Sequence, residues 1–366
     1  MLFYRTSVTA NLLPDRTVCL RYDDGPGLTQ APMPATGPRT DDLGFYLFLQ
    51  GIPATFFVTG EHAASEPELC LQLTRWGHSV VNHTQTHNGL PWETPAQMIA
   101  DVVDADFSIG AAANPDSLLL GPPYLSWSEA VASVLNGDPQ TRKYTGPIGS
   151  NIGGDDWQFW EDPNKTPSDK LTDCVNSYYN GITQARCGIV TMHDSSQNPA
   201  AAALNQTFEL TRRLIPQLIA DGYRFIRLDA APQVRSAMLV SSIVGLKAAN
   251  SLYISPQGGG GGSILANGPG LYAWEELGLV QLGNGQHAIR TPNGQFMSTQ
   301  PTGEILANGN GVSDWEKFDL IGPSPVKIKA SNGNYATVPT FGPFAGHIMA
   351  NATVAQAELF TLEYVT

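Results

Sequence analysis

Two adjacent carboxylates follow the first strongly apolar segment of the chain. Asp23 and Asp24 come directly after Thr17–Tyr22 and precede Gly25-Pro26. On its own, such a sequence is most often a solvated turn. Neighbouring like charges at a strand end are costly unless their roles are divided, for instance when a cation binds one carboxylate and leaves the other as a base.

A histidine pair further along could bind the same cation. His83 and His87 are four residues apart, so on one helical turn both imidazoles would face the same side. With one carboxylate they would form a two-His, one-Asp site with open positions for water and substrate, as hydrolytic metals require. Alone, this spacing is more often coincidental, and His78 is predicted to be structural.

The elements that position these residues are predicted to alternate between strands and helices. Thr94-Pro95 is typical of a helix start, and Met98, Val102 and Ala105 follow at helical spacing. Short apolar segments predict buried parallel strands. The pattern favours an α/β barrel or a doubly wound sheet, whose reactive groups gather at the strand C-terminal ends. The predicted strands are Thr17–Tyr22, Ala54–Val58, Gly188–Met192 and Arg224–Leu228.

Five segments, in this order, resemble the polysaccharide deacetylase superfamily, the family 4 carbohydrate esterases with a NodB-homology domain. The resemblance spans roughly residues 12 to 230 and implies a distorted (β/α) barrel. Its patterns Thr-Phe-Asp-Asp-Gly and His-Ser/Thr-x-x-His match Asp23-Asp24-Gly25 and His83–His87. The ends of the remaining three match Pro122-Pro123-Tyr124, Gly154-Asp155-Asp156-Trp157 and Met192-His193.

The resemblance implies a role for each matched residue in a metal-dependent hydrolase. The implied metal ligands are Asp24, His83 and His87, and the ion is expected to be Zn²⁺ because hard and borderline ligands without thiolate suit it. The implied catalytic residues are Asp23 as general base, His193 as general acid, Asp156 orienting His193, and Tyr124, whose backbone N–H would stabilise an oxyanion. Trp157, Pro123 and Met192 are implied to bind substrate.

Two positions depart from the family patterns. Gly121 stands where the third pattern has an arginine beside the base, and Thr191 stands where the fifth has a leucine in the acetyl pocket. Without that arginine we expect a more basic or more mobile Asp23, unless Arg21 or Arg75 substitutes; Arg21, two residues away on a strand, would share its face. The Pro- and Thr-rich segment 28–38 predicts an inserted loop beside the metal.

The last third of the chain contains an internal repeat of about 40 residues. Ile264-Leu265-Ala266-Asn267 recurs at Ile305–Asn308 and, as Ile-Met-Ala-Asn, at Ile348–Asn351. Glu275, Glu316 and Glu358 follow the three copies. The repeat resembles the fascin-like group of β-trefoils, with Gly258–Gly262 as a turn insertion. We predict a catalytic domain over 1–235 and a β-trefoil, expected to bind carbohydrate, over 244–366, with the boundary near 230–243. A trefoil can also bind protein or act as a structural cap.

Composition and charge limit the partners. Of the 366 residues, 42% are hydrophobic and 14% charged, with a net charge of −13; no stretch approaches the ~20 apolar residues of a membrane span. Residues 244–366 carry 5 Lys/Arg and 8 Asp/Glu, which leaves −10 for the residues before them. An acidic protein repels phosphate backbones, so nucleic acid and anionic membranes are unlikely partners, whereas a neutral polysaccharide is acceptable.

Three features of the sequence concern where the protein is located: its cysteines, its N-terminus and two asparagines. Cys174 and Cys187 form either one disulfide or two unpaired core residues. The start of the chain lacks the features of a secretion signal, so a leader is absent from this sequence or the chain is not exported. An extracellular or cell-wall setting is nevertheless expected for a polymer substrate. Asn164-Lys165-Thr166 and Asn205-Gln206-Thr207 could accept glycans.

The function that these observations favour is removal of N-acetyl groups from a GlcNAc-containing polysaccharide, chitin-like or peptidoglycan-like. Two alternatives remain open. An O-acetyl esterase acting on xylan, or another amide hydrolase of the superfamily, would use the same ligands. A carbohydrate-binding protein that has lost turnover through Gly121 and Thr191 is the alternative outside enzymes, although the intact acidic and histidine residues argue against it.

Overall fold

The computed structural model describes residues 3–33 and 35–365, which divide into two compact units with separate hydrophobic cores. The first unit is Phe3–Ala231, and the second begins at Pro232. The break falls inside the predicted boundary region but assigns 232–235 to the second unit. The reason is that Gln233 Nε2 donates to the Asn293 carbonyl (2.7 Å) and Arg290 Nε donates to Ser236 Oγ (2.9 Å). Residues 1, 2, 34 and 366, including parts of the predicted N-terminal region and of the 28–38 loop, lie outside the described residues.

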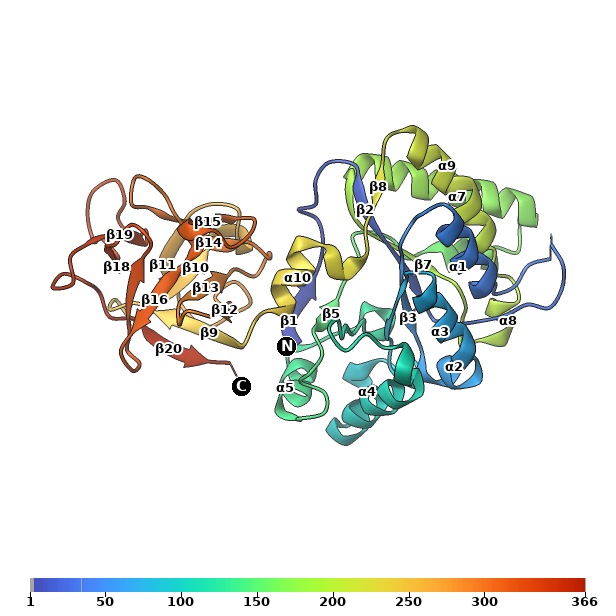
Figure 1. The fold of residues 1–366 in the computed structure, drawn as a ribbon, viewed down its shortest axis with the longest axis horizontal. Coiled ribbons are helices and arrows are strands. Elements are labelled where there is room, and N and C mark those ends of the chain that lie inside the picture. Colours follow the sequence, from blue (N-terminus) through green and yellow to red (C-terminus); the bar gives the residue numbers. More distant parts are fainter. Residues whose placement is uncertain (1–2, 34, 366) are drawn as a thin grey trace. The chain divides into compact units, whose positions relative to one another are not determined.

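The first unit alternates strands and helices (Figure 1). Its strands are β1 (Phe3–Val8), β2 (Thr17–Asp23), β3 (Thr55–Val58), β4 (Ser79–Asn82), β5 (Gly146–Ile148), β6 (Ile152–Gly153), β7 (Cys187–His193) and β8 (Arg224–Phe225). Its helices are α1 (Thr40–Leu49), α2 (Gly60–Ser65), α3 (Pro67–Arg75), α4 (Pro95–Ile109), α5 (Glu129–Gly137), α6 (Asp156–Glu161), α7 (Pro167–Ala185), α8 (Pro199–Ala202) and α9 (Thr207–Ala220).

The strands of this unit pair in parallel, as predicted. The main sheet has the order β4-β3-β2-β7-β6, and β8 pairs with the first half of β2. Isolated parallel bridges, Asn82↔Leu120 and Leu119↔Thr145, continue the pairing beyond β4 toward β5, which pairs with β1. Helices α3, α1, α9 and α7 pack against one another in that order. This arrangement brings the C-terminal ends of β2, β3, β4 and β7 together at one edge.

Burial explains why the central elements form. All seven residues of β2 are buried between β3 and β7, and Tyr22 stacks on Phe56 with ring centroids 5.1 Å apart. Helix α4 begins at Thr94 with a capping box, and the predicted apolar face of Met98, Val102 and Ala105 is buried. These two predictions are confirmed. His78 is also structural, since its ring nitrogens contact the Ala54 N–H (3.2 Å) and the Gly44 carbonyl (2.9 Å).

The second unit is an antiparallel sheet of twelve strands within the described residues, preceded by helix α10 (Pro232–Met238). The strands are β9 (Ser242–Lys247), β10 (Tyr253–Pro256), β11 (Ile264–Gly268), β12 (Leu277–Gln281), β13 (His287–Arg290), β14 (Phe296–Thr299), β15 (Ile305–Gly309), β16 (Phe318–Ile321), β17 (Lys327–Ala330), β18 (Tyr335–Thr337), β19 (Met349–Ala352) and β20 (Thr361–Tyr364).

These strands repeat the same local pattern three times. The hairpins β10–β11, β14–β15 and β18–β19 start from equivalent pairs, namely Tyr253↔Gly268, Phe296↔Gly309 and Tyr335↔Ala352, each followed by a shift in register. Strands β9, β12, β13, β16 and β17 pair in succession. A bridge joins Val326 to Phe360, and β20 pairs with β9, so the succession closes on itself. The Gly258–Gly262 segment lies in the turn between β10 and β11.

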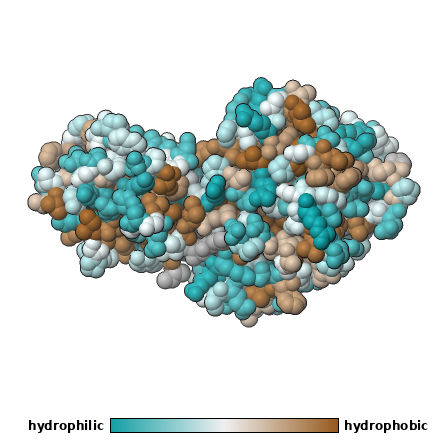
Figure 2. All heavy atoms as spheres, in the orientation of Figure 1, coloured by the Kyte–Doolittle hydropathy of each residue, from teal (hydrophilic) through white to brown (hydrophobic). Residues whose placement is uncertain are grey.

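The visible surface (Figure 2) is mixed in polarity, and the cysteines are unpaired. Figure 2 shows hydrophilic and hydrophobic residues interspersed over the visible face. No helix within the described residues is both long and apolar enough to cross a bilayer. All four cysteines are free, and Cys174 is buried whereas Cys187 is half-buried. A disulfide between these two, which the sequence left open, is therefore not formed.

Candidate active site

A cavity of about 720 Å³ collects most of the predicted site residues. Strands β2 and β7 pair in parallel with Asp23 opposite His193, so both side chains lie at the same sheet edge. Tyr22 and Met192, the preceding residues, point to the opposite face, as strand alternation requires. The cavity lining includes Asp23, Asp24, His83, His87, Tyr124, Trp157, Thr191 and His193.

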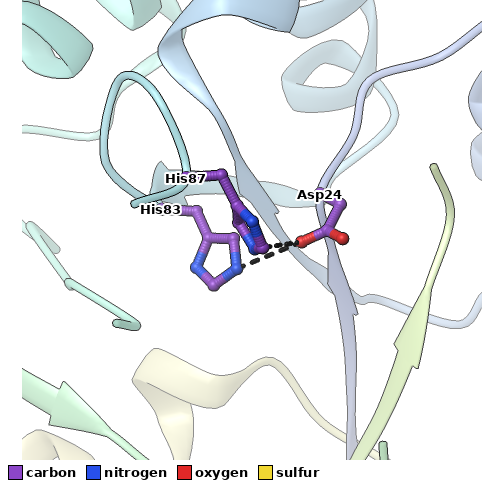
Figure 3. Close-up of side chains that lie close together, drawn as sticks. All are labelled: Asp24, His83 and His87. Carbon is purple, nitrogen blue, oxygen red and sulfur yellow. Dashed lines mark ion pairs between the residues drawn. The ribbon is translucent and has the colours of Figure 1, made fainter. Parts of the chain in front are cut away.

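Asp24, His83 and His87 form a possible metal site (Figure 3). One potential ligand atom of each lies within 4.8 Å of the others. Asp24 Oδ1 is 2.9 Å from His87 Nε2 and 3.3 Å from His83 Nε2. His83 Nδ1 is 2.7 Å from the Gly121 carbonyl, so it donates its proton there and leaves Nε2 free to bind an ion.

The prediction that one helical turn aligns the two histidines is wrong. Residues 83–89 form an irregular loop after β4, and the non-glycine residues Thr84 and His87 have φ of 65° and 61°. Such left-handed conformations are uncommon for these residues and cost free energy. The loop, not helical spacing, turns both imidazoles toward Asp24.

The ligand set suits a divalent cation. Burial raises the pKa of Asp24, but the His83 and His87 imidazoles beside it outweigh this effect and hold that pKa well below its usual range. Asp24 Oδ1 is buried and has no hydrogen-bond partner among the described residues, apart from the two close imidazole nitrogens. One carboxylate oxygen and two imidazole nitrogens without a thiolate match the donors of hydrolytic zinc sites.

Asp23 is held by an arginine that the sequence offered only as a candidate. Arg21 Nε and Nη2 each donate to one carboxylate oxygen of Asp23 at 2.7 Å, and the Arg21 side chain is fully buried. The condition that another arginine substitutes for Gly121 is therefore met by Arg21. Arg75 ends helix α3 instead.

His193, which lines the cavity, forms a second charged pair with the fully buried Asp156 behind it. Asp156 Oδ1 is 2.7 Å from His193 Nδ1, and Asp156 Oδ2 accepts the His193 backbone N–H at 2.9 Å. Burial lowers the pKa of His193, but the charge and hydrogen bond of Asp156 act more strongly and raise it to about 10. The imidazole is thus protonated at neutral pH, with Nε2 left to donate to a substrate atom.

The predicted substrate-binding residues separate into two groups. Trp157 lines the cavity and is 46% exposed, and Tyr124 is 63% exposed with its ring 4.7 Å from that of His87. Met192 instead lies in the core, fully buried, with its sulfur 3.9 Å from Thr211 Oγ1. Pro123 is buried and is not among the residues that line the cavity in the described chain. Neither Met192 nor Pro123 is therefore placed to contact substrate through its side chain.

The second departure from the family pattern, Thr191, lies in the cavity lining but turns its hydroxyl to a neighbouring side chain. Thr191 is 2% exposed, and its hydroxyl is 2.8 Å from Ser150 Oγ. The predicted inserted loop, segment 28–38, contacts Asn205, which lines the cavity. Gly37 N–H donates to the Asn205 carbonyl (2.8 Å), and Thr36 Oγ1 donates to the Ala203 carbonyl (2.7 Å).

Sequence reasoning missed two buried residues that support this edge. Asp194 Oδ2 accepts a hydrogen bond from Thr40 Oγ1 (2.5 Å), and burial raises the Asp194 pKa to about 7. A Cβ on Gly25 would lie 2.2 Å from Asp194 Oδ2, so Asp194 requires the glycine after the two aspartates. Asn205 is 4% exposed and donates to the His193 carbonyl (2.7 Å). The idea of a glycan at Asn205 is therefore wrong for the folded protein.

Sequence comparisons relate the first unit to known proteins. A sequence profile of the family described as polysaccharide deacetylase matches residues 11–139. A chitooligosaccharide deacetylase of Bradyrhizobium sp. is 36% identical over 121 residues, 32% of this chain and 51% of that protein, so the chain spans only about half of it. A second, from Sinorhizobium fredii, is 28% identical over 214 residues, 57% of this chain and 87% of that protein. A peptidoglycan-N-acetylglucosamine deacetylase of Bacillus cereus is 25% identical over 216 residues, 59% of this chain and 87% of that protein. The first unit is therefore similar in sequence to polysaccharide deacetylases.

Proposed function

We propose that the first unit is a metal-dependent hydrolase that removes N-acetyl groups from GlcNAc-containing saccharides, chitin-like or peptidoglycan-like. The observation that carries this proposal is the convergence of three groups on one cavity. These are the Asp24–His83–His87 ligand set, the Asp23 carboxylate fixed beside it, and the protonated His193 on the adjacent strand. Amide hydrolysis needs all three kinds of group.

The chain's own residues divide the proton transfers. Asp23 accepts a proton from the attacking water, and its bonds to Arg21 hold the carboxylate in one orientation. His193 donates a proton to the leaving nitrogen, and Asp156 keeps the imidazole protonated and oriented. We assign the Tyr124 backbone N–H to the oxyanion, which is supported by the place of this residue in the cavity lining. Trp157 borders the bound sugar.

A divalent metal held by Asp24, His83 and His87, for which we propose Zn²⁺, would supply Lewis acidity to the acyl oxygen and to water. The pKa of Asp24 keeps this ligand ionised across the whole physiological range. His83 is already in the tautomer that leaves Nε2 available.

The test combines metal analysis of the purified full-length protein with acetate release from chitin oligomers, peptidoglycan and acetylxylan. We expect one equivalent of zinc and release from one of the two GlcNAc substrates. Release from acetylxylan alone would replace the amidase proposal with an esterase. No release from any of them, with metal bound, would reject the proposed activity.

For the second unit we propose a β-trefoil of the fascin-like group that holds the enzyme on its polymer. The closed succession of six strands and the three equivalent hairpins support this fold. Trp274 and Trp315 support carbohydrate binding, because they stand directly before Glu275 and Glu316 in consecutive repeats and are 52% and 45% exposed. Exposed aromatic faces are suited to pack against sugar rings.

Deleting the chain from Pro232 tests this role. We expect acetate release from short soluble oligomers to persist and release from insoluble polymer to fall, because tethering raises local concentration without changing the chemical step. Circular dichroism must first show that the truncated unit is folded. Equal activity on both substrates would mean that the second unit does not target the enzyme. We further propose an extracellular or cell-wall site of action, which cell fractionation of the native host would test.

A further inference from the structure

We propose that Arg21 is the positioning residue of Asp23, and that Gly121 is its structural counterpart: the guanidinium reaches the base from strand β2, and only glycine at 121 leaves room for it. The inference rests on the proposed function for the role of Asp23. That the arginine beside Asp23 comes from position 21, and that position 121 needs a glycine, rests on the geometry alone.

The guanidinium of Arg21 is fixed on every side. Besides its two bonds to Asp23, Nη1 donates to the carbonyls of Ile148 (2.8 Å) and Gly149 (3.1 Å) at the end of β5. Its Cζ lies 4.1 Å from the centroid of the Phe57 ring, a cation–π contact. A planar fork that binds both carboxylate oxygens sets orientation as well as distance. Asp23 therefore cannot rotate without breaking two charge-assisted bonds.

Gly121 lies where a side chain would displace this arrangement. A Cβ at residue 121 would be 2.5 Å from Phe57 Cδ1 and 2.8 Å from Arg21 Nη2. Its φ is not in the left-handed region, so it is space and not backbone conformation that demands glycine. The Gly121 carbonyl also accepts the proton of His83 Nδ1. One loop residue thus orients a metal ligand through its backbone and admits the guanidinium through its lack of a side chain.

The first test compares Arg21→Ala with Arg21→Lys. For Arg21→Ala we expect kcat to fall on the order of 10²-fold with little change in KM, because a misplaced reacting group affects the chemical step. Metal content should stay at the wild-type level, since Arg21 contacts none of the three ligands. Added guanidinium ion, at concentrations below those that unfold the protein, should restore part of kcat in Arg21→Ala. Arg21→Lys should be intermediate, because an ammonium cannot form the fork.

A matched control comes from the same unit. Arg227 binds Asp229 with the same two-residue spacing and the same fork, at 2.9 and 2.9 Å, but away from the cavity. Arg227→Ala should leave kcat unchanged and show no response to guanidinium. Loss of kcat in Arg21→Ala that neither guanidinium nor lysine restores, together with a lower melting temperature, would make Arg21 merely structural and overturn the proposal.

A crystal structure of Arg21→Ala separates this proposal from the proposed function. We expect the Asp23 carboxylate to rotate while Asp24, His83 and His87 stay in place. If the carboxylate rotates but the wild-type protein releases no acetate, the proposed function fails and the positioning role stands. If the carboxylate keeps its orientation, or the active wild type and Arg21→Ala have equal kcat, the positioning role fails.

Discussion

In the first unit, Asp23, Asp24 and Asp156 are buried against arginine or histidine side chains, whereas in the second unit Glu275 and Glu316 are buried against uncharged donors, namely hydroxyls and backbone N–H groups. Glu275 accepts from Ser255 Oγ (2.6 Å) and from the Tyr272 N–H (3.1 Å). Glu316 accepts from the Ser313 N–H (2.8 Å) and Oγ (2.5 Å). Burial of a carboxylate alone therefore does not indicate a catalytic site; convergence of several on one cavity does.

Backbone strain follows the same division. Of the seven non-glycine residues with positive φ in the described part of the first unit, five belong to or adjoin the segments that line the cavity: Asp24, Thr84, His87, Tyr124 and Leu125. The other two, Arg16 and Arg186, do not line it. Within the described part of the second unit, Ser251 alone has such a φ. Strained residues persist where the surrounding structure holds them, and they gather at functional sites.

The largest effect is expected from the ligands. His83→Ala or His87→Ala should remove the metal and lower kcat by at least ~10³-fold, since several kcal/mol of transition-state stabilisation is lost. Elemental analysis measures the metal content, and acetate release measures kcat. His347→Ala is the control in the second unit, because His347 pairs with Glu304 at 2.9 Å without facing the cavity. Full metal occupancy in His83→Ala would contradict the site.

Asp23→Asn separates the two adjacent aspartates. It should keep the metal but lower kcat by about 10²- to 10⁴-fold, the usual contribution of a general base. Asp229→Asn, in the Arg227 pair, should leave both quantities unchanged. Metal loss in Asp23→Asn would show that Asp23 and Asp24 have exchanged roles.

Asp156→Asn should change the pH dependence. The general acid must be protonated, and Asp156 raises the His193 pKa to about 10, so we expect the alkaline limb of the kcat profile to move to lower pH in the variant. The pair also stabilises the folded state fully below pH ~6.5, the ordinary histidine pKa, and this contribution is lost as the pH rises to about 10. Urea unfolding measures this effect: the free energy of unfolding should differ less between pH 6 and pH 9 in Asp156→Asn than in the wild type.

Tyr178→Phe is the control for that pH effect. It removes a hydroxyl 3.3 Å from Asp156 Oδ1 but keeps the carboxylate. An alkaline limb that moves equally in both variants would mean that packing near Asp156, and not its charge, sets the His193 pKa.

The smallest effect is expected in the second unit. Glu316→Gln replaces a carboxylate that accepts two bonds, so we expect a loss of about 1 to 3 kcal/mol in the free energy of unfolding of this unit. Acetate release from soluble oligomers should not change. Asp314→Asn in the same turn, whose side chain is 89% exposed, should have little effect on unfolding. Lower activity of Glu316→Gln on soluble substrate would mean that the buried carboxylates of the second unit also affect catalysis, against the difference drawn between the two units.

The apolar runs of the sequence predicted β2, β3, β7 and β8, because buried parallel strands are continuously apolar, but not β1, β4, β5 or β6. Most of the residues chosen from the motifs do line one cavity. The β7 pattern also contained a signal that was not used: His193 and Met192 are neighbours on a strand, so they could not both face the cavity. The role of Asp194 depends on Gly25 and Thr40, more than 100 residues away, and local spacing does not reveal such contacts. Asn205 lies only 12 residues from His193, but a segment that is irregular apart from the short helix α8 brings the two together. The loop that orients His87 was likewise not visible in helical spacing.

The pairing of β20 with β9 has a consequence for synthesis. These strands lie about 115 residues apart in the sequence, since Lys247 pairs with Thr361 and Val244 with Tyr364. On the ribosome, the ring of the second unit stays open until its final strand has emerged, while every strand of the first unit is already available. Closing such a distant contact is slow. From the time β9 is synthesised until β20 emerges, the edge of β9 that β20 will pair with is exposed. The nascent protein is most prone to aggregation during this interval.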